Sequence, residues 1–241
     1  TKEQFEIFTD KRLFKDFCIN HNVDVIPDYS EEDILNGTAE YPLFIKPSIC
    51  RGSRGQSICY TKEEALEGLK LAKELSADGK CICEKYMGGK QDIASAFFVV
   101  DGEPYQVKFG DRYLGRPEDG LDKQVMCTKF PSDFTPTFEA KVQQRVKDMI
   151  KALGIKFGPV FLQGFVDGET IRYYDPALRM PGGDYDLVLK AATGFDTVKS
   201  LIHFALTGDT KTWFGDPTDC YKLNGGVGMI ICFSVREGHM A

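Results

Sequence analysis

A glycine-rich stretch that follows a lysine is the first feature of the sequence with the means to do chemistry. Residues 47–55 read Pro-Ser-Ile-Cys-Arg-Gly-Ser-Arg-Gly, and Lys46 ends the apolar segment before them. Because glycine allows close approach and a positive φ, backbone N–H groups in such a turn can converge on an anion. Lys46, Arg51 and Arg54 add positive charge there. The pattern is neither a P-loop nor a dinucleotide fingerprint, so a hairpin loop with solvated arginines stays open as the alternative.

A second candidate lies where an expected strand, residues 80–86, runs into a Met-Gly-Gly-Lys linker. Glu84 lies near the end of this strand, and Gln91 and Asp92 follow the linker. The strand edge offers backbone donors and acceptors to an adenine, and Gln91 or Asp92 can take ribose hydroxyls. The alternative is an ordinary connection between two strands.

A third candidate is a pair of oxygen-bearing side chains, Gln163 and Asp175. They lie on the two strands of an expected hairpin whose turn is Asp167-Gly168. Pairing of these strands can bring both oxygens to one face, and paired oxygens suit Mg²⁺, which keeps several waters and bridges phosphates. Arg179, just beyond, can hold a phosphate with two N–H groups. The alternative is that the Asp-Pro pair simply ends a strand.

The elements that must position these residues follow from apolar periodicity, capping residues and turns. We expect helices over residues 9–20, 30–37, 61–77, 135–154 and 196–207. We expect strands over residues 41–46, 56–60, 80–86, 93–100, 104–109, 125–130, 160–166, 170–175 and 227–235. The polar stretch 110–122 is expected to be a loop. Antiparallel hairpins mixed with helices favour an α+β fold over a strict βαβ alternation.

Composition argues against several classes of function. The 241 residues carry a formal net charge of −6, which argues against a general nucleic-acid binder. The longest apolar runs, 96–100 and 229–233, are far shorter than the roughly 20 residues that span a bilayer, and no membrane partner is expected. The cysteines include no CxxC pair and most lie in strand-like stretches, which predicts free thiols in a reducing cytoplasm.

Taken in chain order, these features resemble the ATP-grasp superfamily, in particular its carbamoyl phosphate synthetase and biotin carboxylase type. The shared order is lysine, glycine-rich loop, carboxylate-bearing linker, metal-ligand hairpin, arginine and Gly-Gly, over residues 1–205. The resemblance implies an ATP-grasp fold, in which two α+β lobes with antiparallel sheets grip ATP. It implies a helical lead-in (1–37), a small lobe with the glycine-rich loop (38–90) and a large lobe with the metal and substrate site (91–241). It also implies a missing N-terminal Rossmann-like domain of the same polypeptide.

The resemblance assigns the nucleotide to two lysines, the loop and the linker. Lys11, in an Asp-Lys-Arg segment, and Lys46 would contact the phosphates. The loop would close over the β- and γ-phosphates through Ser48, Gly52, Ser53, Arg54 and Gly55. The adenine would lie against Glu84, Lys85, Tyr86 and Met87, with Glu84 near the exocyclic amine and Lys85 and Met87 using backbone atoms. Gln91 or Asp92 stands at the position of a ribose-binding carboxylate.

The metal motif follows the same resemblance with one departure. Gln163 and Asp175 stand at the positions of the Mg²⁺ ligands, and Arg179 would brace the transferring phosphate. The family usually reads Glu-x-Asn-x-Arg where this chain reads Asp-Pro-Ala-Leu-Arg. Ala177 cannot ligate a metal, so we expect a weakened second metal site.

The implied function is that of an ATP-dependent carboxylate–amine ligase with ATP and Mg²⁺ as cofactors. A substrate carboxylate would attack the γ-phosphate to give an acyl phosphate, and an amine or another nucleophile would displace the phosphate. The expected catalytic residues are Arg179, Lys46 and Arg112, with Arg112 as an anchor for the substrate carboxylate or, alternatively, a solvated loop arginine. The expected partners are small-molecule carboxylate and amine substrates, and we also consider a homodimer. The alternatives are a degenerate ATP-grasp module without efficient catalysis and an α+β interaction domain without nucleotide.

Overall fold

The computed structural model describes residues 1–50, 54–115 and 125–232 of the chain. Three short helices lead in: α1 (Lys2–Thr9), α2 (Lys11–Asn20) and α3 (Glu31–Asn36). Asp10 separates the first two, because its extended backbone ends α1 while its side chain accepts the Arg12 N–H at 2.8 Å and caps α2. The expected helix over 9–20 is therefore α2, and α1 was not expected.

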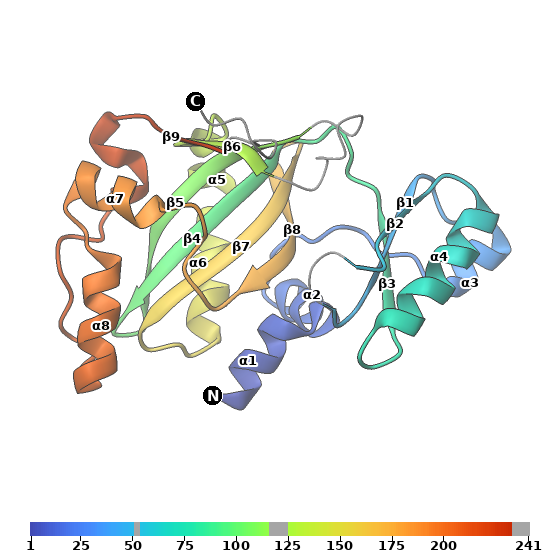
Figure 1. The fold of residues 1–241 in the computed structure, drawn as a ribbon, viewed down its shortest axis with the longest axis horizontal. Coiled ribbons are helices and arrows are strands. Elements are labelled where there is room, and N and C mark those ends of the chain that lie inside the picture. Colours follow the sequence, from blue (N-terminus) through green and yellow to red (C-terminus); the bar gives the residue numbers. More distant parts are fainter. Residues whose placement is uncertain (51–53, 116–124, 233–241) are drawn as a thin grey trace, which may run out of the picture.

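A small three-stranded antiparallel sheet has the order β2-β1-β3. Its strands are β1 (Leu43–Pro47), β2 (Ser57–Cys59) and β3 (Cys81–Lys85), and α4 (Lys62–Leu75) covers one face. Ala65, Leu69 and Ala72 of α4 are buried in one cluster with apolar side chains of the sheet. Figure 1 shows this unit to the right of the larger sheet.

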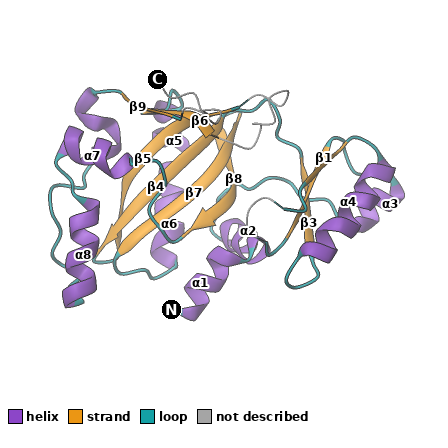
Figure 2. Cartoon of the chain, in the orientation of Figure 1, coloured by secondary structure: helices purple, strands orange, loops and turns teal. Residues whose placement is uncertain are grey.

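A six-stranded antiparallel sheet has the order β8-β7-β4-β5-β6-β9. Its strands are β4 (Asp92–Val100), β5 (Glu103–Leu114), β6 (Val125–Phe130), β7 (Gly158–Asp167), β8 (Thr170–Ala177) and β9 (Gly228–Ile231). Every residue of the central strand β4 is buried, because both faces of the sheet are covered. The described chain thus has an α+β fold with antiparallel sheets, as expected from the sequence (Figure 2).

Helices cover the two faces of the large sheet with two separate apolar clusters. On one face, side chains of α1, α2, α5 (Thr135–Lys141) and α6 (Gln143–Ala152) meet the sheet around Phe97 and Phe109. On the other face, α7 (Tyr185–Thr193), α8 (Thr197–Thr207) and the 3₁₀ segment η2 (Cys220–Gly225) meet it around Phe98 and Phe161. No helix in the described ranges is long and apolar enough to cross a membrane.

Several expected boundaries differ from the structure. The stretch 110–122 was expected to be a loop, but β5 extends to Leu114. The expected helix 135–154 is broken at Val142, whose φ of −121° is not helical. Helix α7 was not expected at all. The expected last strand is shorter, since β9 ends at Ile231, and residues from 233 onward lie outside the described chain.

One extended segment, residues 23–28, joins the two sheets. Val25 forms a bridge to Tyr173 of β8, and Asp28 forms a bridge to Glu84 of β3. The N–H of Lys85 also donates to the carbonyl of Pro27 at 3.0 Å. The lead-in therefore makes backbone contact with both sheets at the place where they approach each other.

Candidate functional site

Glu84 and Lys46 form a buried ion pair on the small sheet. Lys46 Nζ lies 2.6 Å from Glu84 Oε2, and the side chains are 4% and 1% exposed. Burial alone would raise the pKa of Glu84, but Lys46 and Lys15 together hold it below its usual value. Lys46 Nζ also lies 5.7 Å from the ring centre of Tyr174 on β8, so its charge faces the large sheet. The carboxylate of Glu84 is thus paired with Lys15 and Lys46, and its expected contact with the adenine amine stays a prediction.

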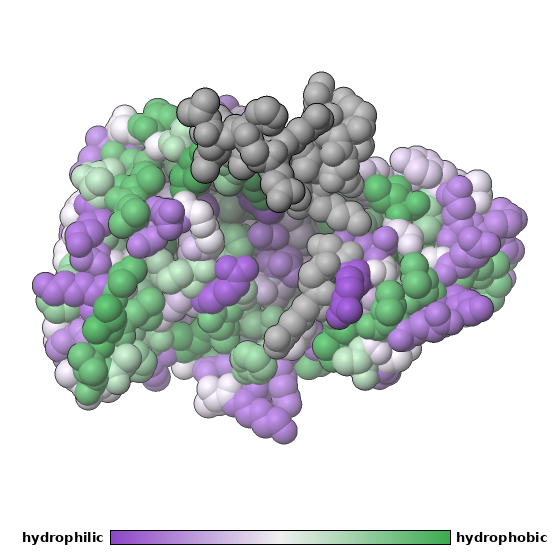
Figure 3. Space-filling view, viewed as in Figure 1, coloured by the Kyte–Doolittle hydropathy of each residue, from purple (hydrophilic) through white to green (hydrophobic). Residues whose placement is uncertain are grey.

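Lys11 begins α2 and reaches the same region. Its pKa is lowered, chiefly by burial, while the carboxylate of Asp175 opposes this and the Lys46 charge adds to it. Lys11 of α2 therefore interacts electrostatically with both Lys46 of β1 and Asp175 of β8. Figure 3 shows the surface hollowed between the two sheet units, with hydrophilic residues inside the hollow.

Gln163 and Asp175 are directly opposite each other on β7 and β8. The two residues are Cα partners, and a bulge follows between Gln163 and Gly164. The Tyr174 hydroxyl donates to Gln163 Oε1 at 3.2 Å, which orients the amide. The sequence-predicted pairing of these two positions is thus the pairing in the structure. Arg179 lies just beyond β8, exposed, with its guanidinium 5.6 Å from the ring centre of Phe161.

Asp92 and Arg112 form a second buried pair on the large sheet. They are Cα partners on β4 and β5, and Arg112 Nη1 donates to both oxygens of Asp92 at 3.1 and 3.0 Å. Nη1 also lies 3.1 Å from the Tyr174 hydroxyl. Burial raises the pKa of Asp92 to about 6, although Arg112 opposes the shift. Arg112 is therefore neither in a loop nor solvated, and part of its guanidinium is already bound by Asp92.

Gln91 lies beside this pair, but its side chain is used by the fold. Its amide nitrogen donates to the carbonyls of Asp92 and Arg112 at 2.8 and 3.0 Å, which ties the ends of β4 and β5 together. Gln91 is half-buried and Asp92 is buried in this arrangement. A ribose contact by either residue stays a prediction.

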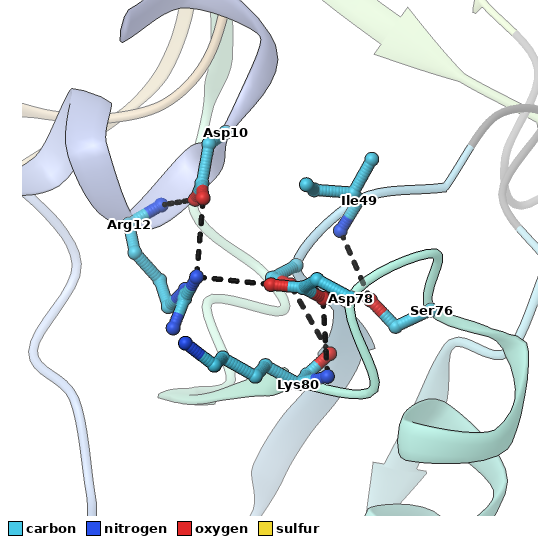
Figure 4. Close-up of polar contacts among 7 residues, drawn as sticks. Asp10, Arg12, Ile49, Ser76, Asp78 and Lys80 are labelled. Atoms are coloured by element: carbon cyan, nitrogen blue, oxygen red, sulfur yellow. Dashed lines mark hydrogen bonds and ion pairs between the residues drawn. The ribbon is translucent and has the colours of Figure 1, made fainter. Parts of the chain in front are cut away.

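The entry to the glycine-rich loop is anchored by a hydrogen-bond network centred on Asp78 (Figure 4). Ser48 is fully buried, and its hydroxyl donates to Asp78 Oδ1 at 2.6 Å, as Ser76 does at 2.7 Å. Arg12 Nη2 donates to Asp78 at 3.0 Å and to Asp10 at 3.1 Å. Burial alone would raise the pKa of Asp78. The hydrogen bonds and the charge of Arg12 outweigh burial and lower this pKa to about 2. The Ser48 hydroxyl thus anchors the loop entry, and its expected contact with phosphate stays a prediction.

The other expected loop and linker residues are placed as follows. Gly52 and Ser53 lie outside the described residues, while Arg54 is exposed. Gly55 has a φ of +71°, and a Cβ there would lie 3.0 Å from the Pro47 ring and 3.1 Å from Leu75, so glycine is required. The Tyr86 N–H donates to Pro42 O at 3.0 Å, and Met87 is buried. Adenine contacts by this linker stay a prediction.

Three residues of this region were missed from the sequence. Lys15 contacts Glu84 and lies one helical turn after Lys11, a spacing that could have indicated it. Tyr174 links Arg112 to Gln163, and no sequence signal distinguishes it from its neighbour Tyr173. Lys108 lies on the same face of the sheet, with Nζ 4.8 Å from the Phe130 ring centre and 4.9 Å from that of Tyr185. Burial lowers the pKa of Lys108 to about 7.

Comparison with known proteins finds similar sequences and similar folds. Residues 10–111 match the family model described as carbamoyl-phosphate synthase L chain, ATP binding domain. The chain is 22% identical over 178 residues to a carbamoyl phosphate synthase large chain of Clostridium perfringens, a match over 72% of this chain and 16% of that protein. The chain thus spans only a small part of the curated relatives it matches.

Solved structures with the same fold include a carboxylase domain and a ligase. The biotin carboxylase domain of Hydrogenobacter thermophilus 2-oxoglutarate carboxylase, in complex with MgADP, ADP and bicarbonate, has a TM-score of 0.70 and 21% identity, over 84% of this chain and 46% of that chain. The L-amino acid ligase of Bacillus licheniformis has a TM-score of 0.66 and 16% identity, over 85% of this chain and 49% of that chain. The two antiparallel sheets, the match of residues 10–111 to the synthase ATP-binding domain and the solved structures together show that the chain has an ATP-grasp fold, similar to that of carbamoyl phosphate synthase and biotin carboxylase.

Proposed function

We propose that the chain binds Mg-ATP in the hollow between its two sheets and transfers the γ-phosphate to a carboxylate substrate. The observation that carries this proposal is the convergence of Lys11, Lys46 and Asp175 from three distant parts of the chain. Two lysines near one carboxylate suit a polyphosphate with a divalent ion beside it. The fold that the chain shares with ATP-grasp ligases supports the same proposal.

The donors on β7 and β8 fit one Mg²⁺. Gln163 and Asp175 supply hard oxygen donors at directly paired positions, which is what this ion prefers. The described residues contain no group of three His, Cys, Asp or Glu side chains that could hold a metal, so phosphate oxygens and water would complete the coordination. When bound, the ion would neutralise charge that develops on the phosphates.

The first chemical step would need little covalent work from the protein. A carboxylate oxygen attacks the γ-phosphorus, the bond to the β–γ bridging oxygen breaks, and ADP leaves with the bonding electrons. Lys11 and Lys46 would hold the phosphates in line and neutralise their charge, and Arg179 would brace the transferring group. The product is an acyl phosphate.

The second step would transfer the acyl group to a nucleophile. An amine attacks the acyl carbon, phosphate leaves with the bonding electrons, and the amine gives up a proton. The acceptor would bind on the face of the large sheet that carries Arg112 and Gln163, close to Arg179. Because Asp92 already occupies one edge of the Arg112 guanidinium, a substrate carboxylate would have to use its remaining N–H groups.

A second candidate function is nucleotide binding without efficient catalysis. Ala177 stands where the family motif has a metal-ligating Asn, and it is the Cα partner of Phe161. Its side chain packs in the apolar cluster beneath α7. The structure therefore offers no oxygen from this position, which favours a single metal ion and slow turnover.

An ADP-release screen over amino acids and dicarboxylic acids, with amines as acceptors, tests the ligase proposal. We expect at least one acid to stimulate ADP release in the wild type, and Lys46→Met to lower the rate by about 100-fold or more. Lys70→Met, an exposed lysine of α4, is the matched control and should leave the rate unchanged. If ATP binds but no acid stimulates ADP release, the nucleotide-binding module is the better account.

A further inference from the structure

Two buried lysines share the single carboxylate of Glu84. Lys46 Nζ lies 2.6 Å from Oε2, and Lys15 Nζ lies 2.8 Å from Oε1. The side chains of Lys15 and Lys46 are 5% and 4% exposed. Lys15 also pairs with Asp28, whose side chain is about half exposed to solvent. Each oxygen of Glu84 thus has its own lysine, although one cation would be enough to neutralise the carboxylate.

The two lysines differ in where they come from and in what they face. Lys46 lies on β1, faces Tyr174 of the large sheet and shares the electrostatic environment of Lys11. Lys15 lies on α2 among the buried side chains Phe14 and Cys18, and it reaches Glu84 from the lead-in. Lys15 therefore reaches the other oxygen of Glu84 from α2, with Asp28 as its second partner.

Movement of Lys46 would have an electrostatic consequence for Glu84. An ATP phosphate competes with Glu84 for the ammonium of Lys46, and a buried carboxylate without a partner is strongly unfavourable. Without another cation, Glu84 would retain Lys46 and oppose phosphate binding. Lys15 is already at hydrogen-bond distance from the other oxygen of Glu84, so the carboxylate stays neutralised when Lys46 turns away.

On this geometry, and resting on the proposed binding of ATP, we propose that Lys15 is a positioning residue that neutralises Glu84 and so releases Lys46 for the nucleotide phosphates. Asp28 completes the arrangement, because its carboxylate offsets the positive charge of Lys15. The group Lys15, Lys46, Glu84 and Asp28 is neutral as a whole, and Glu84 keeps Lys15 as a partner when Lys46 moves to a phosphate.

A binding cycle with ATP and Mg²⁺ tests this assignment, by calorimetric titration of the wild type, Lys15→Met, Glu84→Gln and the double variant. We expect Lys15→Met to weaken ATP binding by about tenfold or more, which is about 1.4 kcal/mol, because Glu84 then retains Lys46. The double variant should recover most of this loss, since no carboxylate remains to hold Lys46. A purely structural role for Lys15 predicts the opposite, namely a double variant at least as impaired as Lys15→Met.

Two controls separate charge from packing. Lys15→Arg keeps the charge and should bind ATP within about threefold of the wild type, and it replaces the test if Lys15→Met fails to fold. Lys73→Met removes a lysine that pairs with Glu31 at the surface at 2.6 Å, with both side chains more than 40% exposed, and should not affect ATP binding. Wild-type affinity in Lys15→Met, no recovery in the double variant, or a tenfold loss in Lys15→Arg overturns the role of Lys15. Failure of the wild type itself to bind ATP would instead overturn the proposed function.

Discussion

At the scale of single residues, two buried lysines of the chain have opposite surroundings. Lys46 is paired with Glu84 at 2.6 Å, so its burial is compensated. Lys108 is also buried, but its described surroundings are aromatic rings, of Phe130 and Tyr185 among others, and the nearby Arg112 charge lowers its pKa further. Rings attract an ammonium group but do not replace its hydration. Lys108 should therefore cost stability that Lys46 does not.

Lys108→Met should stabilise the fold, and the gain should depend on pH. The pKa of Lys108 is about 7 in the fold against an ordinary value of 10.5. Between these values the unfolded chain binds a proton that the native chain does not, so stability rises with pH across this window and the full penalty applies below it. We expect a gain above about 1 kcal/mol at pH 7 that shrinks as the pH approaches the ordinary value. Urea unfolding at several pH values measures it.

Lys151→Met is the control, because Lys151 lies at the surface and pairs with Glu103 at 2.8 Å. Its removal should change the free energy of unfolding by less than about 0.5 kcal/mol. A gain from Lys108→Met that is the same at all pH values would contradict the assignment of the penalty to a buried charge.

Arg112→Met tests the buried pair on the large sheet. The substitution leaves the Asp92 carboxylate buried beside Tyr174 without its cation. We expect a loss of about 3 kcal/mol in the free energy of unfolding. The double variant Arg112→Met/Asp92→Asn should lose clearly less, since no charge stays unpaired. Equal losses in the two variants would show that the side-chain volume of Arg112, and not its charge, matters.

At the scale of elements, the glycine-rich loop depends on a turn that is distant in sequence. Asp78, after α4, receives hydrogen bonds from Ser48, Ser76 and Arg12, and Arg12 belongs to the same helix as Lys11. The loop entry and the first turn of α2 are thus held by one carboxylate. This connects the position of the loop to the position of Lys11.

Ser48→Ala should loosen this connection. The hydroxyl is buried and makes its shortest bond to Asp78 at 2.6 Å, so its loss should lower the free energy of unfolding by about 1–2 kcal/mol. Thr207→Ala is the control, because its hydroxyl bonds to its own helix at the surface at 2.8 Å, and it should cost less than about 0.5 kcal/mol. A Ser48→Ala variant as stable as the control would show that the network does not hold the loop entry.

Elements with clear periodicity and caps could be predicted from sequence. Helix α8 (Thr197–Thr207) follows its cap Asp196, and β6 (Val125–Phe130) has the expected bounds. Helix α7 (Tyr185–Thr193) was missed because no side-chain cap marks its start, since Asp184 precedes it in a left-handed conformation. The extension of β5 through Arg112 was missed because a polar sequence predicts a loop, and only the pairing with Asp92 explains its burial.

At the scale of the whole molecule, the candidate site lies where the two sheets and the N-terminal helical segment meet. Local patterns indicated Lys46, Gln163 and Asp175 one at a time, and the resemblance added Lys11 and ordered them. The contacts of Lys15 with Glu84 and of Tyr174 with Arg112 could not be predicted in this way, because they join residues far apart in sequence. The segment that bridges Tyr173 and Glu84 brings these distant residues together.

The central claim is that this convergence forms an ATP site, and calorimetric titration with ATP in the presence of Mg²⁺ tests it most directly. We expect the wild type to bind one ATP, and Lys46→Met to bind at least about 100-fold more weakly, since a buried phosphate contact is lost. Lys70→Met, exposed on α4, should bind as the wild type does. No heat of binding at ATP concentrations of about 5 mM, or equal affinity in Lys46→Met and the wild type, would contradict the account.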